Sequence, residues 1–209
     1  MPPIVSKYYR SIAQGFSLLL LLTACSTDHP KLPRLSQDAV VLAFGDSLTY
    51  GAGVEEQDSY PAVLQRLISR KVLRAGVPSE VTAAGLVRLS DALDEHAPKL
   101  LILCHGGNDF LRNLGEQQAA ENIRAMIALA KGKGVDVVLV GVPKAGLLLS
   151  SAEFYQAIAQ EFAIPYEAGA LSDILASREL KSDTVHPNAQ GYRKLAEALA
   201  SLLKESGAI

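Results

Sequence analysis

Short apolar runs alternate with longer amphipathic segments along most of this chain. Residues 39–44 and 100–104 contain no charged or amide side chain, which is typical of strands buried on both faces of a sheet. Residues 60–70 and 188–204 instead place apolar side chains at the spacing of one helix face. Because neighbouring parallel strands need a crossover between them, the alternation predicts an α/β fold with a central parallel sheet covered by helices.

The remaining elements follow the same order. We expect further strands near 72–73, 135–140 and 164–166, and further helices near 86–93, 119–131 and 152–162. With no repeat or second boundary, residues 38–209 are predicted to form one domain. The net charge is −2 and no basic run is present, so nucleic acid is not expected as a partner.

The first residues have the layout of a bacterial secretory signal. Lys7 and Arg10 precede an apolar run at 17–22, and small residues follow it. That run is far shorter than the roughly 20 residues that cross a bilayer. Residues 22–25, Leu-Thr-Ala-Cys, resemble a lipobox, which implies a signal peptide at 1–24 and a lipid on Cys25. The alternative is an ordinary signal with a cysteine there by chance.

Cleavage before Cys25, with a lipid on that residue, would determine how the mature protein is attached to the membrane. Loss of Lys7 and Arg10 changes the net charge from −2 to −4, so the lipid on Cys25 would be the attachment to the membrane. The lipobox resemblance, with Ser26 next, implies a bacterial cell envelope protein anchored in the outer membrane. Residues 25–37 are expected to be a tether, and Cys104, left without a partner, a buried inert thiol.

Three motifs stand directly after predicted strands or before the last helix. They are Gly-Asp-Ser-Leu at 45–48, Gly-Gly-Asn-Asp at 106–109 and Asp-Thr-Val-His-Pro-Asn at 183–188. Each alone has a structural explanation as a turn or helix cap. The carboxyl ends of parallel strands share one edge of the sheet, where ligands bind, so the first two motifs are expected to meet there.

Together, these residue types suit nucleophilic catalysis. The hydroxyl of Ser47 needs a base to remove its proton, and His186 can supply one. Asp183, three residues upstream, can hold the imidazole in a single tautomer. The oxyanion that forms needs fixed donors, for which Asn108 and the backbone N–H of Ser47 are candidates.

The three motifs resemble those of the SGNH, or GDSL, hydrolase family, especially its bacterial thioesterase, lysophospholipase and arylesterase branch. The resemblance extends from about residue 41 to the last helix. It implies a flavodoxin-like three-layer α/β/α sandwich, Ser47, Asp183 and His186 as the catalytic triad, and Asn108 as an oxyanion donor.

One block departs from the pattern of the branch. Residues 74–81 read Arg-Ala-Gly-Val-Pro-Ser-Glu-Val, where the branch usually reads close to Asn-Ala-Gly-Val-Pro-Gly-Glu-Thr. The glycine whose N–H serves the oxyanion hole is therefore replaced by Ser79. A backbone donor survives this change, but Ser79 would be strained if the position requires a positive φ.

Other residues are weaker candidates. We expect Asp46 to point away from the nucleophile and brace its loop, and His105 either to line the pocket or to have a structural role. His29 and His96 are not assigned a function. Leu147, Leu148 and Leu149 are either buried or form the wall of an acyl pocket, as the corresponding family loop does. No cluster has the spacing of metal ligands, so neither a metal nor a cofactor is expected.

The sequence therefore predicts a serine esterase that hydrolyses small acyl or aryl esters, lysophospholipids or thioesters through an acyl-enzyme. Two alternatives remain open. One is a carbohydrate O-deacetylase acting on envelope glycan. The other is a non-catalytic envelope lipoprotein that binds a lipid or a protein partner. No oligomeric state is predicted.

Overall fold

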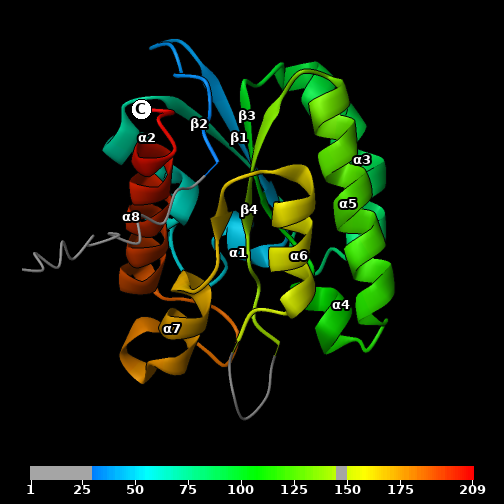
Figure 1. Cartoon of the computed structure of the whole chain (residues 1–209). Coiled ribbons are helices and arrows are strands. Elements are labelled where there is room, and N and C mark those ends of the chain that lie inside the picture. Colours follow the sequence, from blue (N-terminus) through cyan, green and yellow to red (C-terminus); the bar gives the residue numbers. More distant parts are fainter. Residues whose placement is uncertain (1–29, 145–149) are drawn as a thin grey trace, which may run out of the picture.

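A five-stranded parallel sheet forms the centre of the molecule (Figure 1). The computed structural model describes residues 30–144 and 150–209. The strands lie in the order β2-β1-β3-β4-β5, and every neighbouring pair is parallel. Their bounds are β1 Val40–Gly45, β2 Lys71–Gly76, β3 Leu100–Cys104, β4 Asp136–Val140 and β5 Tyr166–Glu167.

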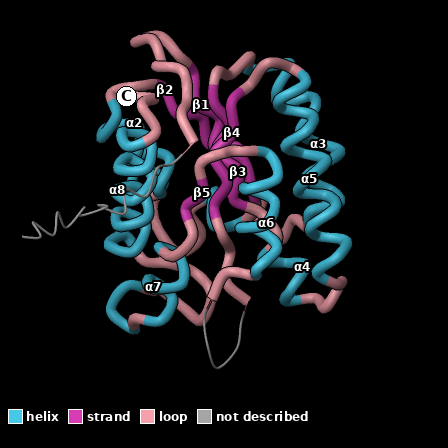
Figure 2. Tube along the Cα trace, in the orientation of Figure 1, coloured by secondary structure: helices cyan, strands magenta, loops and turns pink. Residues whose placement is uncertain are grey.

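Helices cover both faces of this sheet (Figures 1 and 2). Helices α2 and α8 pack together on one face, and α3, α5 and α6 form the other layer. The bounds of these five are α2 Tyr60–Ile68, α3 Thr82–His96, α5 Glu116–Gly132, α6 Glu153–Phe162 and α8 Ala189–Glu205. Shorter turns complete the chain: α1 Ser47–Tyr50, α4 Gly107–Leu111, α7 Ala170–Ala176 and the 3₁₀ turns Glu56–Asp58 and Arg178–Leu180.

The strand order determines where a ligand can bind. The order 2-1-3-4-5 is that of flavodoxin-like folds. In these folds the ligand crevice lies at the carboxyl ends of β1 and β3, where the order of the strands reverses. Strands β1 and β3 lie side by side at this point, with Gly45 opposite Cys104. A side chain at Gly45 would overlap the carbonyl of Cys104, so glycine here allows the close approach of the two strand ends.

This architecture confirms the predicted three-layer α/β/α fold with a central parallel sheet. The individual elements differ in detail. Strand β2 is longer than the two residues predicted, and β5 begins at Tyr166, at the end of the predicted run. Helices α4 and α7 were not predicted, because each is too short to show a helical period.

Part of the segment predicted to be a tether is packed on the domain. The N–H of Leu32 donates to Ser206 O at 2.9 Å, and that of Leu35 donates to Ala208 O at 2.8 Å. The side chain of Leu35 is buried in the main hydrophobic core. We call residues 32–37 the N-terminal strap. The packed chain thus begins about six residues before the predicted domain boundary, while Cys25 and the signal segment lie outside the described residues.

Within the described parts of the chain, no helix is long and apolar enough to span a membrane.

Candidate active site

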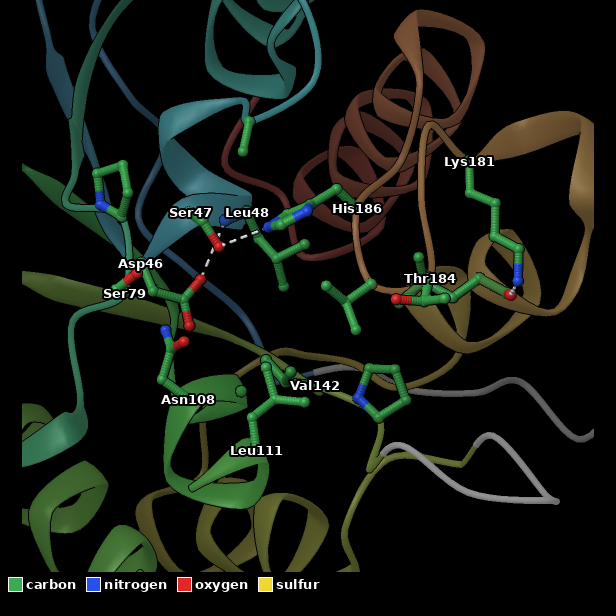
Figure 3. Close-up of a pocket in the computed structure, with 16 residues that line it drawn as sticks. Asp46, Ser47, Leu48, Ser79, Asn108, Leu111, Val142, Lys181, Thr184 and His186 are labelled. Carbon is green, nitrogen blue, oxygen red and sulfur yellow. Dashed lines mark hydrogen bonds between the residues drawn. The ribbon is translucent and has the colours of Figure 1, made fainter. Parts of the chain in front are cut away.

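Ser47, His186 and Asp183 form a continuous hydrogen-bonded chain at the carboxyl edge of the sheet. Figure 3 shows the Ser47–His186 link of this chain. Ser47 is the first residue of α1, directly after β1, and its Oγ lies 2.9 Å from His186 Nε2. His186 Nδ1 lies 2.8 Å from Asp183 Oδ2. The fold therefore brings together the three residues that the motifs singled out, across 139 positions of sequence.

Asp183 also organises its own loop. Its Oδ1 accepts hydrogen bonds from the N–H groups of Val185 at 2.8 Å and His186 at 2.9 Å. Partial burial favours a higher pKa for Asp183, but the hydrogen bonds from the His186 ring and the two N–H groups outweigh it, so the pKa lies below its usual value. The carboxylate therefore stays ionised and keeps the proton of the imidazole on Nδ1.

Three hydrogen-bond donors could bind an oxyanion here: the backbone N–H groups of Ser47 and Ser79, and the side-chain amide of Asn108. In the described parts of the chain, the N–H groups of Ser47 and Ser79 donate no hydrogen bond. Asn108, in α4 just after β3, donates one Nδ2 hydrogen to Glu80 O at 2.9 Å, which leaves the second hydrogen available. Ser47, Ser79 and Asn108 all line the same cleft (Figure 3).

Ser79 has a positive φ, which is the case in which strain was expected at this position. Its φ is 64°, in the left-handed region where a side chain costs about 1–2 kcal/mol. Neighbouring contacts hold the turn in this conformation: Glu80 N–H donates to Val77 O at 3.2 Å, and Arg112 Nη2 donates to Ser79 O at 2.8 Å.

Asp46 differs in part from expectation. Its Oδ1 caps α1 by accepting the N–H of Leu48 at 3.0 Å, so it does brace the nucleophile loop. However, the carboxyl also lines the cleft instead of pointing away from it, and its buried Oδ2 has no partner in the described chain. Burial raises the pKa of Asp46. The reason is geometric: α1 is one short turn, so its capping residue faces the same opening as Ser47.

A buried ion-pair network lies behind the Ser79 turn. Both carboxylate oxygens of Glu80 accept from Arg88, at 2.8 Å from Nε and 2.7 Å from Nη2. His105 Nε2 lies 3.1 Å from Glu80 Oε2. Although burial favours a higher pKa, the hydrogen bonds from Arg88 and His105 lower the pKa of Glu80 to about 2.

His105 has a structural position and does not line the cleft. The N–H of Gly106 donates to His105 Nδ1 at 3.0 Å, so Nδ1 must carry a lone pair. The ring proton is therefore on Nε2, where it donates to Glu80. The structural interpretation of this histidine is the one that the contacts support.

The cleft itself has a volume of about 500 Å³ and a mostly apolar wall. That size is within the range of small-molecule sites, which are apolar with a few placed polar groups. Leu111 lies at its rim with 51% of its surface exposed. Lys181 and Thr184 also line it. The apolar lining residues are Leu48, Ala52, Pro78, Leu111, Val142, Pro143, Leu175 and Val185.

Several residues that contribute to this site have no recognisable signal in the sequence. Leu111, Lys181 and Arg88 belong to no motif singled out above, and Glu80 lies in the block at 74–81 without a role of its own. For Glu80 and Arg88, the separation of eight residues, on a turn and the helix after it, was the only feature available. Conversely, Leu147, Leu148 and Leu149 lie outside the described residues. In the described chain, no group of three or more His, Cys, Asp or Glu is placed to hold a metal ion.

Several known proteins are similar to this chain in sequence. The sequence model of the GDSL-like Lipase/Acylhydrolase family matches residues 43–194, which include the residues of the three motifs. Esterase TesA of Pseudomonas aeruginosa is 31% identical over 131 residues, which cover 59% of this chain and 63% of that protein. An arylesterase of Vibrio mimicus is 27% identical over 197 residues, which cover 89% of this chain and 94% of that protein.

Solved structures agree with the sequence comparisons. The crystal structure of AlinE4, an SGNH-hydrolase family esterase, has a TM-score of 0.65 and 29% sequence identity. The match covers 81% of this chain and 97% of that chain.

Proposed function

Because this chain belongs to the GDSL-like lipase/acylhydrolase family and is a serine ester hydrolase, we propose that it cleaves acyl esters through an acyl-enzyme formed on Ser47. The observation that carries this assignment is the Ser47–His186–Asp183 chain, with both links shorter than 3 Å, opening into an apolar cleft.

The Ser47–His186–Asp183 chain supplies the nucleophile, the base and the acid of the reaction. His186 Nε2 takes the proton of Ser47 Oγ while the oxygen attacks the ester carbonyl, and Asp183 stabilises the imidazolium. The N–H groups of Ser47 and Ser79 and the amide of Asn108 bind the oxyanion. The imidazolium then protonates the departing alcohol. A water molecule, deprotonated by His186, releases the acid from Ser47 in the second half of the cycle.

The cleft favours substrates with an apolar acyl or aryl group. We expect the acyl chain to lie along the wall that includes Leu111, Val142 and Val185. Each methylene that becomes buried contributes up to about 0.8 kcal/mol, or about a fourfold gain in kcat/KM. Aryl esters, esters of medium-length acids and lysophospholipids are therefore the proposed substrates, and thioesters are secondary because an envelope protein would rarely meet acyl-CoA.

Hydrolysis of p-nitrophenyl esters from acetyl to long acyl tests this function, with the soluble protein starting at Ser26 and its Ser47→Ala variant. Activity that rises beyond acetyl and is lost in the variant is the expected result. A maximum at acetyl with no gain for longer chains would indicate the O-deacetylase alternative. A folded protein that is inactive on every ester would contradict the proposal.

The location is a second, separate proposal. The sequence around Cys25 supports a lipid anchor, and residues 26–31 would connect it to the strap with a reach of at most about 20 Å. The strap pairs with Ser206, which follows the C-terminal end of α8. His186 lies just before the N-terminal end of α8, and the 17 residues of this helix span about 25 Å. The cleft would therefore open away from the anchoring membrane.

Labelling of cells with a radioactive fatty acid tests the anchor. The native protein should incorporate label and sediment with membranes, whereas a Cys25→Ala variant should do neither. Equal labelling of both proteins would exclude Cys25 as the lipid site.

A further inference from the structure

The oxyanion hole rests on a turn whose conformation is unfavourable for its own residue. Ser79 has a φ of 64°, and its side chain lies at the surface. A residue other than glycine leaves this region when nothing holds it there. Contacts around the turn must therefore hold it: Arg112 Nη2 donates to Ser79 O at 2.8 Å, and Glu80 N–H donates to Val77 O at 3.2 Å.

The side chain of Glu80 in turn anchors this turn to the rest of the domain. It is only 7% exposed, and its two oxygens accept three hydrogen bonds, two from Arg88 and one from His105. Arg88 is fixed in turn: its guanidinium lies 4.0 Å from the centre of the Phe44 ring, and Nη2 donates to Ala75 O at 3.2 Å. Glu80 thus ties the turn to α3 and to the residue that follows β3, and through Arg88 to β1 and β2.

The main chain of Glu80 also reaches the second oxyanion donor. Its carbonyl accepts one Nδ2 hydrogen of Asn108 at 2.9 Å. An amide group is planar, so this bond sets the direction of the other Nδ2 hydrogen. One residue therefore holds the Ser79 N–H on one side and orients the Asn108 amide on the other.

We propose that Glu80, held by Arg88 and His105, is the positioning residue of the oxyanion hole. This inference rests on the proposed esterase function. Glu80 does not touch the reacting atoms; it acts through the positions of Ser79 and Asn108. Losing one oxyanion donor typically costs 10²–10³-fold in kcat, and misplacing donors that remain present should cost less.

Glu80→Gln is the test, because it keeps the shape of the side chain. Its amide offers one oxygen and one NH₂ to three donors, so at least one donor loses its acceptor. We expect kcat to fall about 10–100-fold while KM changes less than about threefold, since the apolar cleft is unaltered. Active-site titration with an organophosphate corrects kcat for any unfolded fraction. Glu161→Gln, which removes the exposed Arg124–Glu161 pair, is the matched control and should leave both constants unchanged.

Ser79→Gly gives the second measurement. Glycine populates positive φ about as readily as negative φ, so the turn should depend less on Glu80. The loss of kcat caused by Glu80→Gln should therefore be at least about threefold smaller when combined with Ser79→Gly. A change limited to global folding would lower the titrated active fraction and leave the two effects on kcat additive.

The outcomes separate the two proposals. A wild-type protein that is inactive on every ester contradicts the esterase function. An active wild type whose Glu80→Gln variant keeps kcat within twofold overturns the positioning role alone. A rise in KM with unchanged kcat also overturns it, because Glu80 would then serve ground-state binding.

Discussion

Asp183 holds the base and its loop with the same carboxylate. Its Oδ2 receives the ring N–H of His186, and its Oδ1 receives two backbone N–H groups. In Asp183→Asn, the amide NH₂ would face Nδ1 and favour the tautomer with the proton on Nε2, which cannot accept the proton of Ser47. We expect kcat on p-nitrophenyl butyrate to fall at least about 100-fold, with the circular dichroism spectrum unchanged.

Asp91→Asn, on the exposed side of α3, provides the control and should behave as wild type. If Asp183→Asn kept more than about a tenth of the wild-type kcat, the orienting role of this carboxylate would be wrong.

Leu111 and Leu114 form a natural pair of test and control. Both are 51% exposed, but only Leu111 lines the cleft. Leu111→Ala should lower kcat/KM for octanoyl esters about 3–10-fold, because roughly 1 kcal/mol of apolar contact with the chain is lost, and should leave acetyl esters within twofold. Leu114→Ala should change neither. Equal effects of the two substitutions on every ester would show that the acyl chain does not pass Leu111.

Among individual residues, the sequence predicted those whose role follows from the chemistry of the side chain and from the motif around it. Asp183 and His186 lie on one loop, and Ser47 and Asn108 each follow a strand, so short motifs were enough to identify them. Glu80 and His105 were different, because a glutamate on a turn and a histidine after a strand have many uses. Only the fold shows that Glu80 and His105, which are 25 positions apart in the sequence, are in contact.

The start of α8 fixes the position of the loop that carries His186. Asn188 caps it: its Oδ1 accepts the N–H of Gly191 at 3.0 Å, and its Nδ2 donates to Glu179 O at 2.8 Å. Asn188→Ala should lower the free energy of unfolding by about 1–2 kcal/mol, measured in urea. A severalfold fall in kcat should accompany it, since the loop with His186 loses a fixed end.

Asn188→Asp separates the two bonds of this residue, because it keeps the cap and loses the donor to Glu179. We expect it to recover most of the stability lost in Asn188→Ala, helped by its negative charge at the helix start. Stability no better than that of Asn188→Ala would assign the effect to the bond with Glu179 instead.

Elements with a long period were predictable and short ones were not. Helices α5 and α8 have 17 residues each, so their apolar faces repeat several times. Helix α4 has five residues and follows Gly106, whose φ is 117°. Such a turn is stabilised by tertiary contacts, here by Asp109 accepting from Thr82, and these contacts leave no local pattern.

The acid stability of the whole molecule should depend on Glu80. Its pKa in the folded protein is about 2, below the ordinary 4.5. A carboxyl with a lowered pKa stabilises the fold above its unfolded value and loses that contribution as pH falls toward its folded value. The gap in unfolding free energy between wild type and Glu80→Gln should therefore be largest above pH 5 and should shrink between about pH 4.5 and 2. A gap that stays constant with pH would contradict this linkage.

The N-terminal strap shows where prediction fails at the scale of the molecule. Its proline, Pro33, and its polar neighbours are typical of a linker, and the alternation of strands and helices begins only at 39–44. Its partners are Ser206 and Ala208, at the other end of the chain, so nothing local could indicate the pairing. The fold class depended on repeated local patterns and was predictable, whereas this closure depends on a few long-range contacts.

Removal of the strap should therefore weaken the domain without changing its chemistry. Leu35 is buried, its N–H is bonded to Ala208 O, and Arg70 Nη2 donates to its carbonyl at 3.2 Å. A protein that starts at Asp38 should unfold about 2–4 kcal/mol more easily in urea than one that starts at Pro30, from the lost burial and hydrogen bonds. Its kcat at 25 °C should stay within twofold, because α8 separates the strap from His186. Equal stability would return residues 32–37 to the tether. A stable protein with altered kcat would show that this end of the molecule communicates with the cleft, which no described contact between them provides.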